Sequence, residues 1–268
     1  MAMKIFRFKF YFNFLAVFFL VSFNDLSAHN AFEKGFSKEQ VQEATLSKQV
    51  FTALMRVEVQ ATQADIDRQY RELGEFLAHL QHKQSKYRSE KRFLAYFFYR
   101  VHRKFLKQYR PHTTLYELLE KGNYDCVTGS ALYAILLDAL GISYQVNEFP
   151  YHVYLTVAAS PNDTFLLEST DPQSGWVTNQ AEQQRRFAFY SQAAKEKNQA
   201  YFQYDFPIRG KINLTQLAGL SYFNEAVANY NQRKIQQAIV LLRQAEQFYA
   251  SRRIESFKSL ISSVAQNN

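Results

Sequence analysis

The stretch from Cys126 to Ile142 constrains the fold of this 268-residue chain more than any other feature. Its sequence is CVTGSALYAILLDALGI, where apolar residues fall on every side of a helix and Gly141 supplies a stop. A helix with almost no polar face has to be buried on most sides. Three strand-like runs follow, ISYQVNEF, HVYLTVA and TFLLEST, and the turn-forming segment 160–163 separates the last two. A buried helix packed on an antiparallel meander predicts an α+β domain.

Helical patterns lie on both sides of this segment. Before it, apolar residues recur at spacings of three and four, which predicts helices over 37–59, 63–80 and 89–110, and a short helix that starts after Thr113 or Thr114 and ends at Gly122. After it, residues 214–231 and 235–250 predict an αα-hairpin, covered by a further helix over 251–264. A single hairpin cannot bury its own apolar face, so we expect it to dock on the preceding domain.

Residues 1–28 have the pattern of a secretory signal peptide. Basic residues precede an apolar run from Tyr11 to Phe23 that is shorter than a membrane span, and Ala28 offers a small residue for cleavage. Leu26 is large for its position, which leaves an uncleaved N-terminal anchor as the alternative. We therefore expect an exported chain, periplasmic or extracellular, with a main domain over 29–200 and a helical segment over 212–268.

The charge is moderately basic. The formal net charge is +8, and loss of residues 1–28 would leave +6. No nucleic-acid-binding motif accompanies this charge, so we expect no nucleic-acid partner and no integral membrane domain beyond the signal segment. The helix predicted over 89–110 is basic and aromatic. It is typical either of a membrane-surface helix or of a core-facing helix with a solvated basic side, and we favour the second interpretation.

The chain has one cysteine, Cys126. It can form no intramolecular disulfide, and it leaves too few thiols for a cysteine-built zinc site. His79 and His82 have no further ligands beside them and are expected to be solvated, so the sequence implies no metal and no organic cofactor. Cys126 lies at the start of the buried helix, where backbone N–H groups and the helix dipole favour a thiolate. It is either a nucleophile or a small capping residue of the core.

His152 and Asp171 extend the first of these interpretations. His152 opens the second predicted strand, from which it could reach a thiol on a helix packed across the sheet. Asp171 follows the third strand and could accept the hydrogen bond of the imidazole. Glu168 is the competing acid, although strand alternation places it on the opposite face from Asp171. A strand-edge histidine and an Asp-Pro turn are the structural alternatives.

These residues resemble the transglutaminase-like superfamily of papain-type cysteine proteins. The resemblance covers 113–176 and rests on NYDCVTGSALYAILLDALGI, PYHVYL and LLESTDPQSGW. It implies Cys126 as nucleophile, His152 as base and Asp171 as orienting acid. It also extends to bacterial members that join such a domain to tetratricopeptide-like helices, which the hairpin of 214–250 resembles. The chain departs from the family pattern at Ser143-Tyr144-Gln145 and Val153-Tyr154, so substrate-binding elements cannot be carried over.

Two functions remain open at this point. The first is an exported cysteine hydrolase or acyl-transferase that forms a thioester with an amide, peptide or protein substrate. The second is a catalytically inactive scaffold that binds a protein partner through its C-terminal helices. Intact triad residues favour the first.

Overall fold

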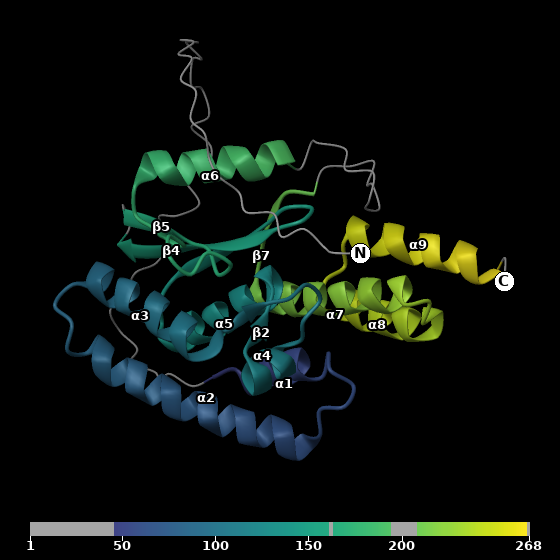
Figure 1. Cartoon of the computed structure of the whole chain (residues 1–268), viewed down its shortest axis with the longest axis horizontal. Helices are drawn as coiled ribbons and strands as arrows, with labels where there is room; N and C mark the ends of the chain where they lie inside the picture. Colours follow the sequence, from purple (N-terminus) through teal and green to yellow (C-terminus); the bar gives the residue numbers. More distant parts are fainter. Residues whose placement is uncertain (1–45, 161–162, 194–207, 267–268) are drawn as a thin grey trace, which may run out of the picture. The chain divides into compact units, whose positions relative to one another are not determined.

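The computed structural model describes residues 46–160, 163–193 and 208–266, which belong to one compact unit (Figure 1). The signal segment and the first half of the helix predicted over 37–59 lie outside these ranges. Within them the chain forms nine α-helices, a five-stranded antiparallel sheet and a pair of short parallel strands. The predicted α+β class is confirmed.

The five-stranded sheet carries the three predicted strands at its centre. These are β3 (Tyr144–Glu148), β4 (Val153–Ser160) and β5 (Asp163–Leu167), and the edges are β6 (Trp176–Val177) and β7 (Gly210–Ile212). The strand order is β6-β5-β4-β3-β7, with antiparallel pairing throughout. Leu155 lies opposite Val146 on one side and Leu167 on the other, and all three are fully buried. Sequence patterns do not predict the two edge strands, because β6 has only two residues and β7 only three.

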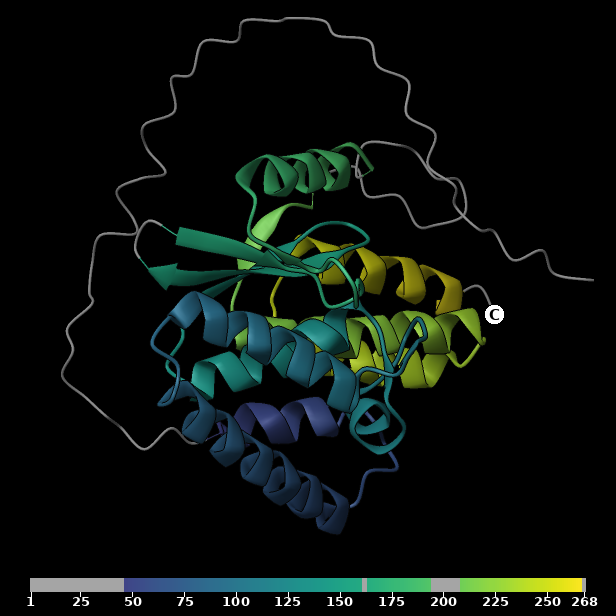
Figure 2. The ribbon, with the colours of Figure 1, turned by 60° about the vertical axis from the view of Figure 1, so that its left-hand side comes forward.

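Helices cover both faces of this sheet. The central helix α5 (Cys126–Ala139) packs on one face, and α6 (Gln180–Ala193), which the sequence analysis did not predict, covers the other (Figures 1 and 2). Val153, Leu155 and Val157 of β4 join the main core with α5, whereas Tyr154 belongs to a smaller apolar cluster with Tyr190 of α6. Side chains of β4 therefore alternate between two apolar layers.

The N-terminal helices are α1 (Lys48–Met55), α2 (Gln63–Gln84), α3 (Glu90–Phe105) and α4 (Leu115–Lys121). Of these, α3 and α4 pack against α5, α1 packs on α7 (Leu214–Asn231), and α2 packs on α1 and α3. Thr62, Ser89 and Thr114 cap three of them with their side chains. Gly122 ends α4 with a φ of 77°, and there β1 (Gln108–Tyr109) pairs with β2 (Asn123–Tyr124). The start of α5 is thereby held between α4 and the sheet.

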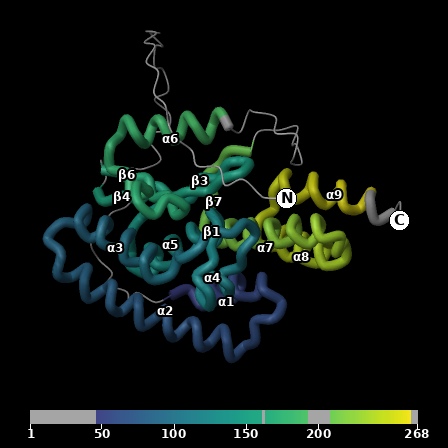
Figure 3. Tube along the Cα trace, viewed as in Figure 1, coloured from purple at the N-terminus to yellow at the C-terminus, as the bar shows by residue number. Residues whose placement is uncertain are grey.

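The C-terminal helices pack together and on the rest of the chain (Figure 3). They are α7 (Leu214–Asn231), α8 (Ile235–Phe248) and α9 (Arg252–Gln266). Gly219 of α7 allows a close approach, because a Cβ atom there would lie 2.6 Å from the Cβ of Tyr249. In turn α7 contacts α5 and α1, and the hydroxyl of Tyr222 donates to the carbonyl of Ala53 at 3.0 Å. Among the described residues, no helix is long and apolar enough to cross a membrane.

Candidate active site

Cys126 is the first residue of α5. Asp125 caps the helix, with its carboxylate accepting a hydrogen bond from the backbone N–H of Thr128 at 2.8 Å. The thiol is half-buried at the edge of the main core. Burial raises the pKa of the thiol well above its ordinary value, the carboxylates of Asp125 and Glu168 raise it further, and backbone hydrogen bonds of Val153 and of Cys126 itself oppose the rise. The resting residue is therefore a neutral thiol.

His152 lies directly before β4 and is paired with an acid. Its Nε2 lies 2.5 Å from Oε2 of Glu168, which follows β5 and is only 2% exposed. The other carboxylate oxygen accepts hydrogen bonds from the backbone N–H and the hydroxyl of Thr170, at 3.1 and 2.7 Å. Burial opposes ionisation of Glu168, but the charge and hydrogen bond of His152 and the Thr170 bonds outweigh it and lower the pKa of the carboxyl. Glu168 is therefore built to stay charged beside the imidazole.

Tyr190 of α6 covers this pair. Its ring centroid lies 4.4 Å from that of His152, and its hydroxyl donates to Oε2 of Glu168 at 2.8 Å. Burial and the neighbouring carboxylate raise the pKa of Tyr190, so the phenol remains a donor. Sequence patterns do not point to Tyr190, because they do not predict the helix that carries it. The available signal was a tyrosine in a stretch whose composition suits a helix.

The acid beside His152 is Glu168 and not Asp171, which corrects the role expected for Asp171. Asp171 pairs with Arg186 of α6 at 2.9 Å, and its other oxygen accepts from the backbone N–H of Ser174 at 2.9 Å, which closes the Asp-Pro turn. The reason is strand alternation. Tyr154 and Leu166 face α6. His152, two residues before Tyr154, and Glu168, two residues after Leu166, therefore share that face.

The thiol of Cys126 lies near the backbone next to His152, and it makes no direct hydrogen bond to the imidazole within the described residues. The backbone of Val153, the residue after His152, is near enough to the sulfur to lower the pKa of the thiol, and the carboxylate of Glu168 is near enough to raise it. In the described part of the chain, no hydrogen bond joins Cys126 to His152, and none involves Nδ1 of the imidazole. The three residues thus lie near one end of the sheet, and Nδ1 of His152 makes no hydrogen bond within the described residues.

His102 of α3 is a polar neighbour that the sequence analysis did not single out. It is 7% exposed, packs edge-on against Tyr124, and its buried Nε2 has no hydrogen-bond partner among the described residues. Burial lowers its pKa, so the ring is neutral. Its position on the apolar side of a helix was the only signal. Trp176, which follows the turn after β5, packs against Phe98 and Phe165.

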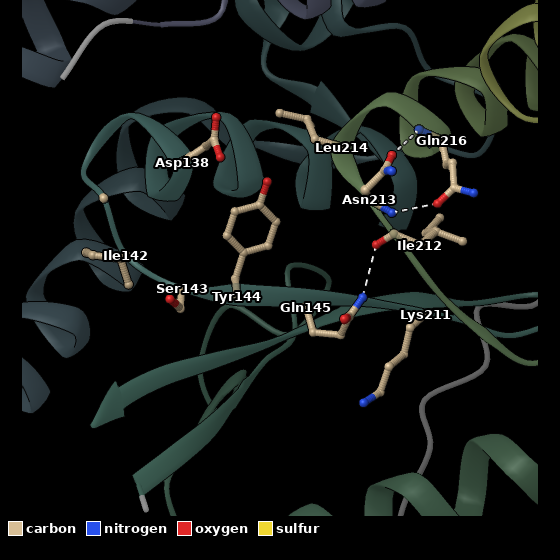
Figure 4. Close-up of a pocket in the computed structure, with 11 residues that line it drawn as sticks. Asp138, Ile142, Ser143, Tyr144, Gln145, Lys211, Ile212, Asn213, Leu214 and Gln216 are labelled. Atoms are coloured by element: carbon tan, nitrogen blue, oxygen red, sulfur yellow. Dashed lines mark hydrogen bonds between the residues drawn. The ribbon is translucent and has the colours of Figure 1, made fainter. Parts of the chain in front are cut away.

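A surface cavity of about 570 Å³ lies elsewhere, at the opposite end of α5 (Figure 4). Asp138, Tyr144 and Lys211 are among its lining residues, together with Asn213 and Gln216, which cap the start of α7 reciprocally. None of the triad candidates lines it.

Neither a family model, nor a curated protein, nor a solved structure matches this chain. Within the described ranges, no group of three or more histidine, cysteine or acidic side chains is placed to hold a metal ion.

Proposed function

We propose that the chain is a cysteine hydrolase or acyl-transferase that acts on amide or peptide bonds. Cys126 is the nucleophile, His152 the base and Glu168 the orienting acid in place of Asp171. The observation that carries the proposal is the 2.5 Å hydrogen bond between Nε2 of His152 and the buried Glu168, at the end of the sheet where Cys126 opens α5. A buried carboxylate that fixes one nitrogen of an imidazole leaves the other free to take a proton.

The raised pKa of the thiol determines how the reaction starts. Because the resting thiol is neutral, attack on the substrate carbonyl is coupled to transfer of the thiol proton to Nδ1 of His152. The two side chains draw together when substrate binds, since active-site hydrogen bonds commonly tighten in the complex. Sulfur bonds to the carbonyl carbon, backbone N–H groups at the start of α5 hold the oxyanion, and the amine leaves with the proton from His152. Water or a second amine then releases the thioester.

We further propose that the fold is a papain-type core of the transglutaminase-like kind. The order of α5, β4 and β5, which carry the nucleophile, the base and the acid in turn, supports this assignment. The close crossing of α7 and α8 through Gly219, Ala226 and Ala238 supports a tetratricopeptide-like hairpin, and a protein partner for the C-terminal helices belongs to the same proposal.

Export is also part of the proposed function. The basic residues, the short apolar run and the small residue at position 28 support cleavage of a signal peptide near Ala28. The lone cysteine is compatible with an oxidising compartment because it has no second thiol in the chain with which to pair.

A second candidate is a non-catalytic scaffold of the same fold. The observation that favours it is the half-buried Cys126 thiol, whose pKa is raised and which makes no direct hydrogen bond to His152 within the described residues. A thiol of this kind is typical of a structural cysteine.

The experiment measures turnover of p-nitrophenyl acetate by the full chain, together with acetylation of Cys126 by intact-mass spectrometry. Cys126→Ser gives the background rate. We expect His152→Ala and Glu168→Gln to lower the rate above background by about 100-fold or more, because each removes part of the general base. Asp171→Asn is the matched carboxylate-to-amide control and should leave the rate unchanged, because Asp171 pairs with Arg186.

Tyr190→Phe is a second test of the same carboxylate, in case Glu168→Gln does not fold. It removes one hydrogen-bond donor from the carboxylate while keeping the ring over His152, and it should reduce the rate less than Glu168→Gln does. A wild-type rate equal to that of Cys126→Ser would refute the catalytic proposal in favour of the scaffold. Equal losses in Asp171→Asn and Glu168→Gln would refute only the choice of acid.

A further inference from the structure

The positive charge of the chain is concentrated in one short stretch. Residues 83–110 contain ten Lys and Arg residues against one acid, Glu90, which gives a formal charge of +9. The whole chain carries +8, so all the other residues together carry −1. The stretch consists of the end of α2, the connection that follows, α3 and the short strand β1. We call these ten cations the α3 basic surface: Lys83, Lys86, Arg88, Lys91, Arg92, Arg100, Arg103, Lys104, Lys107 and Arg110.

These cations are in contact with water rather than with carboxylates. Eight of the ten are exposed, and Lys83 and Arg100 are half-buried. No ion pair among the described residues involves any of them. The contacts they make are with rings and carbonyls: Arg100 and Lys104 lie over the ring of Phe76. Their charge is therefore uncompensated within the described structure.

The surface has a definite geometry. Arg92 and Arg103 fall on one side of α3 by helical spacing, opposite the side that buries Phe93, Phe97 and Val101. Lys104 is exposed near the end of the helix. Figure 1 shows α3 at the left-hand side, beside α5, and Figure 2 shows α3 turned to the front. Exposed tyrosines accompany the cations: Tyr87, Tyr99 and Tyr109 are 36, 44 and 53% exposed. The buried apolar face holds the helix rigidly, so the basic side is presented without further ordering.

We infer that the α3 basic surface binds the anionic headgroups of a phospholipid membrane. Charge complementarity is the first argument, because clustered cations without carboxylate partners gain most from a negatively charged plane. Tyrosine is the second, since its ring and hydroxyl suit the headgroup region of a bilayer. The third is the apolar run from Tyr11 to Phe23 with its basic flank, which predicts that the chain meets a membrane.

The test measures binding of the full chain to two kinds of vesicle. One kind is pure phosphatidylcholine and the other is equal parts of phosphatidylcholine and phosphatidylglycerol, so the neutral vesicles report any binding by the apolar N-terminal segment. We expect tighter binding to the anionic vesicles, with a preference that falls as salt is raised. The triple change Arg92→Gln, Arg103→Gln, Lys104→Gln should weaken binding to the anionic vesicles about 100-fold, from about fivefold per charge near the surface.

The matched control removes the same charge elsewhere. Lys211→Gln, Lys234→Gln and Arg243→Gln alter exposed residues of β7 and of the region around α8, and should leave most of the preference intact. Equal losses in the two triple variants would overturn the inference, because they would indicate a response to net charge alone. An absence of preference for anionic vesicles would overturn it as well. Stronger binding to a single-stranded oligonucleotide than to the anionic vesicles would replace the membrane with nucleic acid.

Discussion

Glu225 shows how one side chain makes the stability of this protein depend on pH. It lies on α7, where burial raises the pKa of its carboxyl to about 7, the hydrogen bond from Asn229 opposes the rise, and the carboxylates of Glu58 and Glu117 add to it. The folded state therefore holds this proton more tightly than the unfolded state does. The contribution of Glu225 to the free energy of unfolding is therefore greatest at acidic pH. It decreases as the pH rises from the ordinary pKa of a glutamate to the raised pKa of about 7.

Glu225→Gln removes this dependence. We expect the variant and the wild type to be about equally stable below the ordinary pKa of a glutamate, and the variant to be more stable at pH 8 by about 1 to 2 kcal/mol, a figure reduced because the group is half-exposed. Urea unfolding at several pH values measures the difference. A constant gap across the range would contradict the assignment.

Glu168 and Asp171 show what residue type alone leaves undecided. Both are acids near the end of β5, and the Asp-Pro step made Asp171 the better match to the family pattern. In the structure, His152 is hydrogen-bonded to Glu168, because the two residues share the face of the sheet that α6 covers. Strand alternation predicts Glu168 as the partner of His152, but only if His152 is known to face α6 rather than α5.

At the scale of elements, α5 depends on its cap. Asp125 is 3% exposed, forms a capping box with Thr128, and also accepts from the backbone N–H of Thr113 at 3.3 Å. Burial raises the pKa of the carboxyl, and these hydrogen bonds oppose the rise. Thr62 forms the equivalent box at the start of α2 on the surface. The two caps are alike in pattern and differ in burial.

Asp125→Ala should therefore cost more than Thr62→Ala. Loss of an exposed cap costs about 0.5 to 1 kcal/mol, whereas loss of the buried one should cost about 2 to 4 kcal/mol, because the N–H groups of Thr113 and Thr128 lose their acceptor away from water. Chemical denaturation of both variants tests the difference. Equal costs would mean that water replaces Asp125 at the start of α5.

The whole molecule is held together by contacts between distant parts of the chain. Glu148 of β3 is 2% exposed and binds Arg253 at 2.7 Å and the hydroxyl of Tyr249 at 2.6 Å, across more than 100 residues. Arg253 also donates to the carbonyls of Phe149 and Pro150. These bonds connect the start of α9 to the loop between β3 and β4, which contains His152.

Arg253→Ala should destabilise the protein by about 3 to 5 kcal/mol, because it leaves the charge of Glu148 buried without a partner. Lys258→Ala is the control, since its ion pair with Glu246 is 44% exposed on both sides and should contribute at most about 1 kcal/mol. Thermal unfolding of both variants measures the effects. Similar shifts in the two would show that Glu148 is solvated or neutral in the folded state.

The sequence by itself determined the elements. The apolar helix after Cys126, the three strands that follow, Thr114 and Gly122 at the ends of α4, and the C-terminal hairpin all carry local signals, because periodicity, caps and turn residues act over a few positions. The tertiary structure alone decided which elements meet. Contacts between residues far apart in the chain determine four features: the helix α6, the edge strands, the partner of His152 and the burial of the Cys126 thiol. A local sequence pattern carries no information about the distances between such residues.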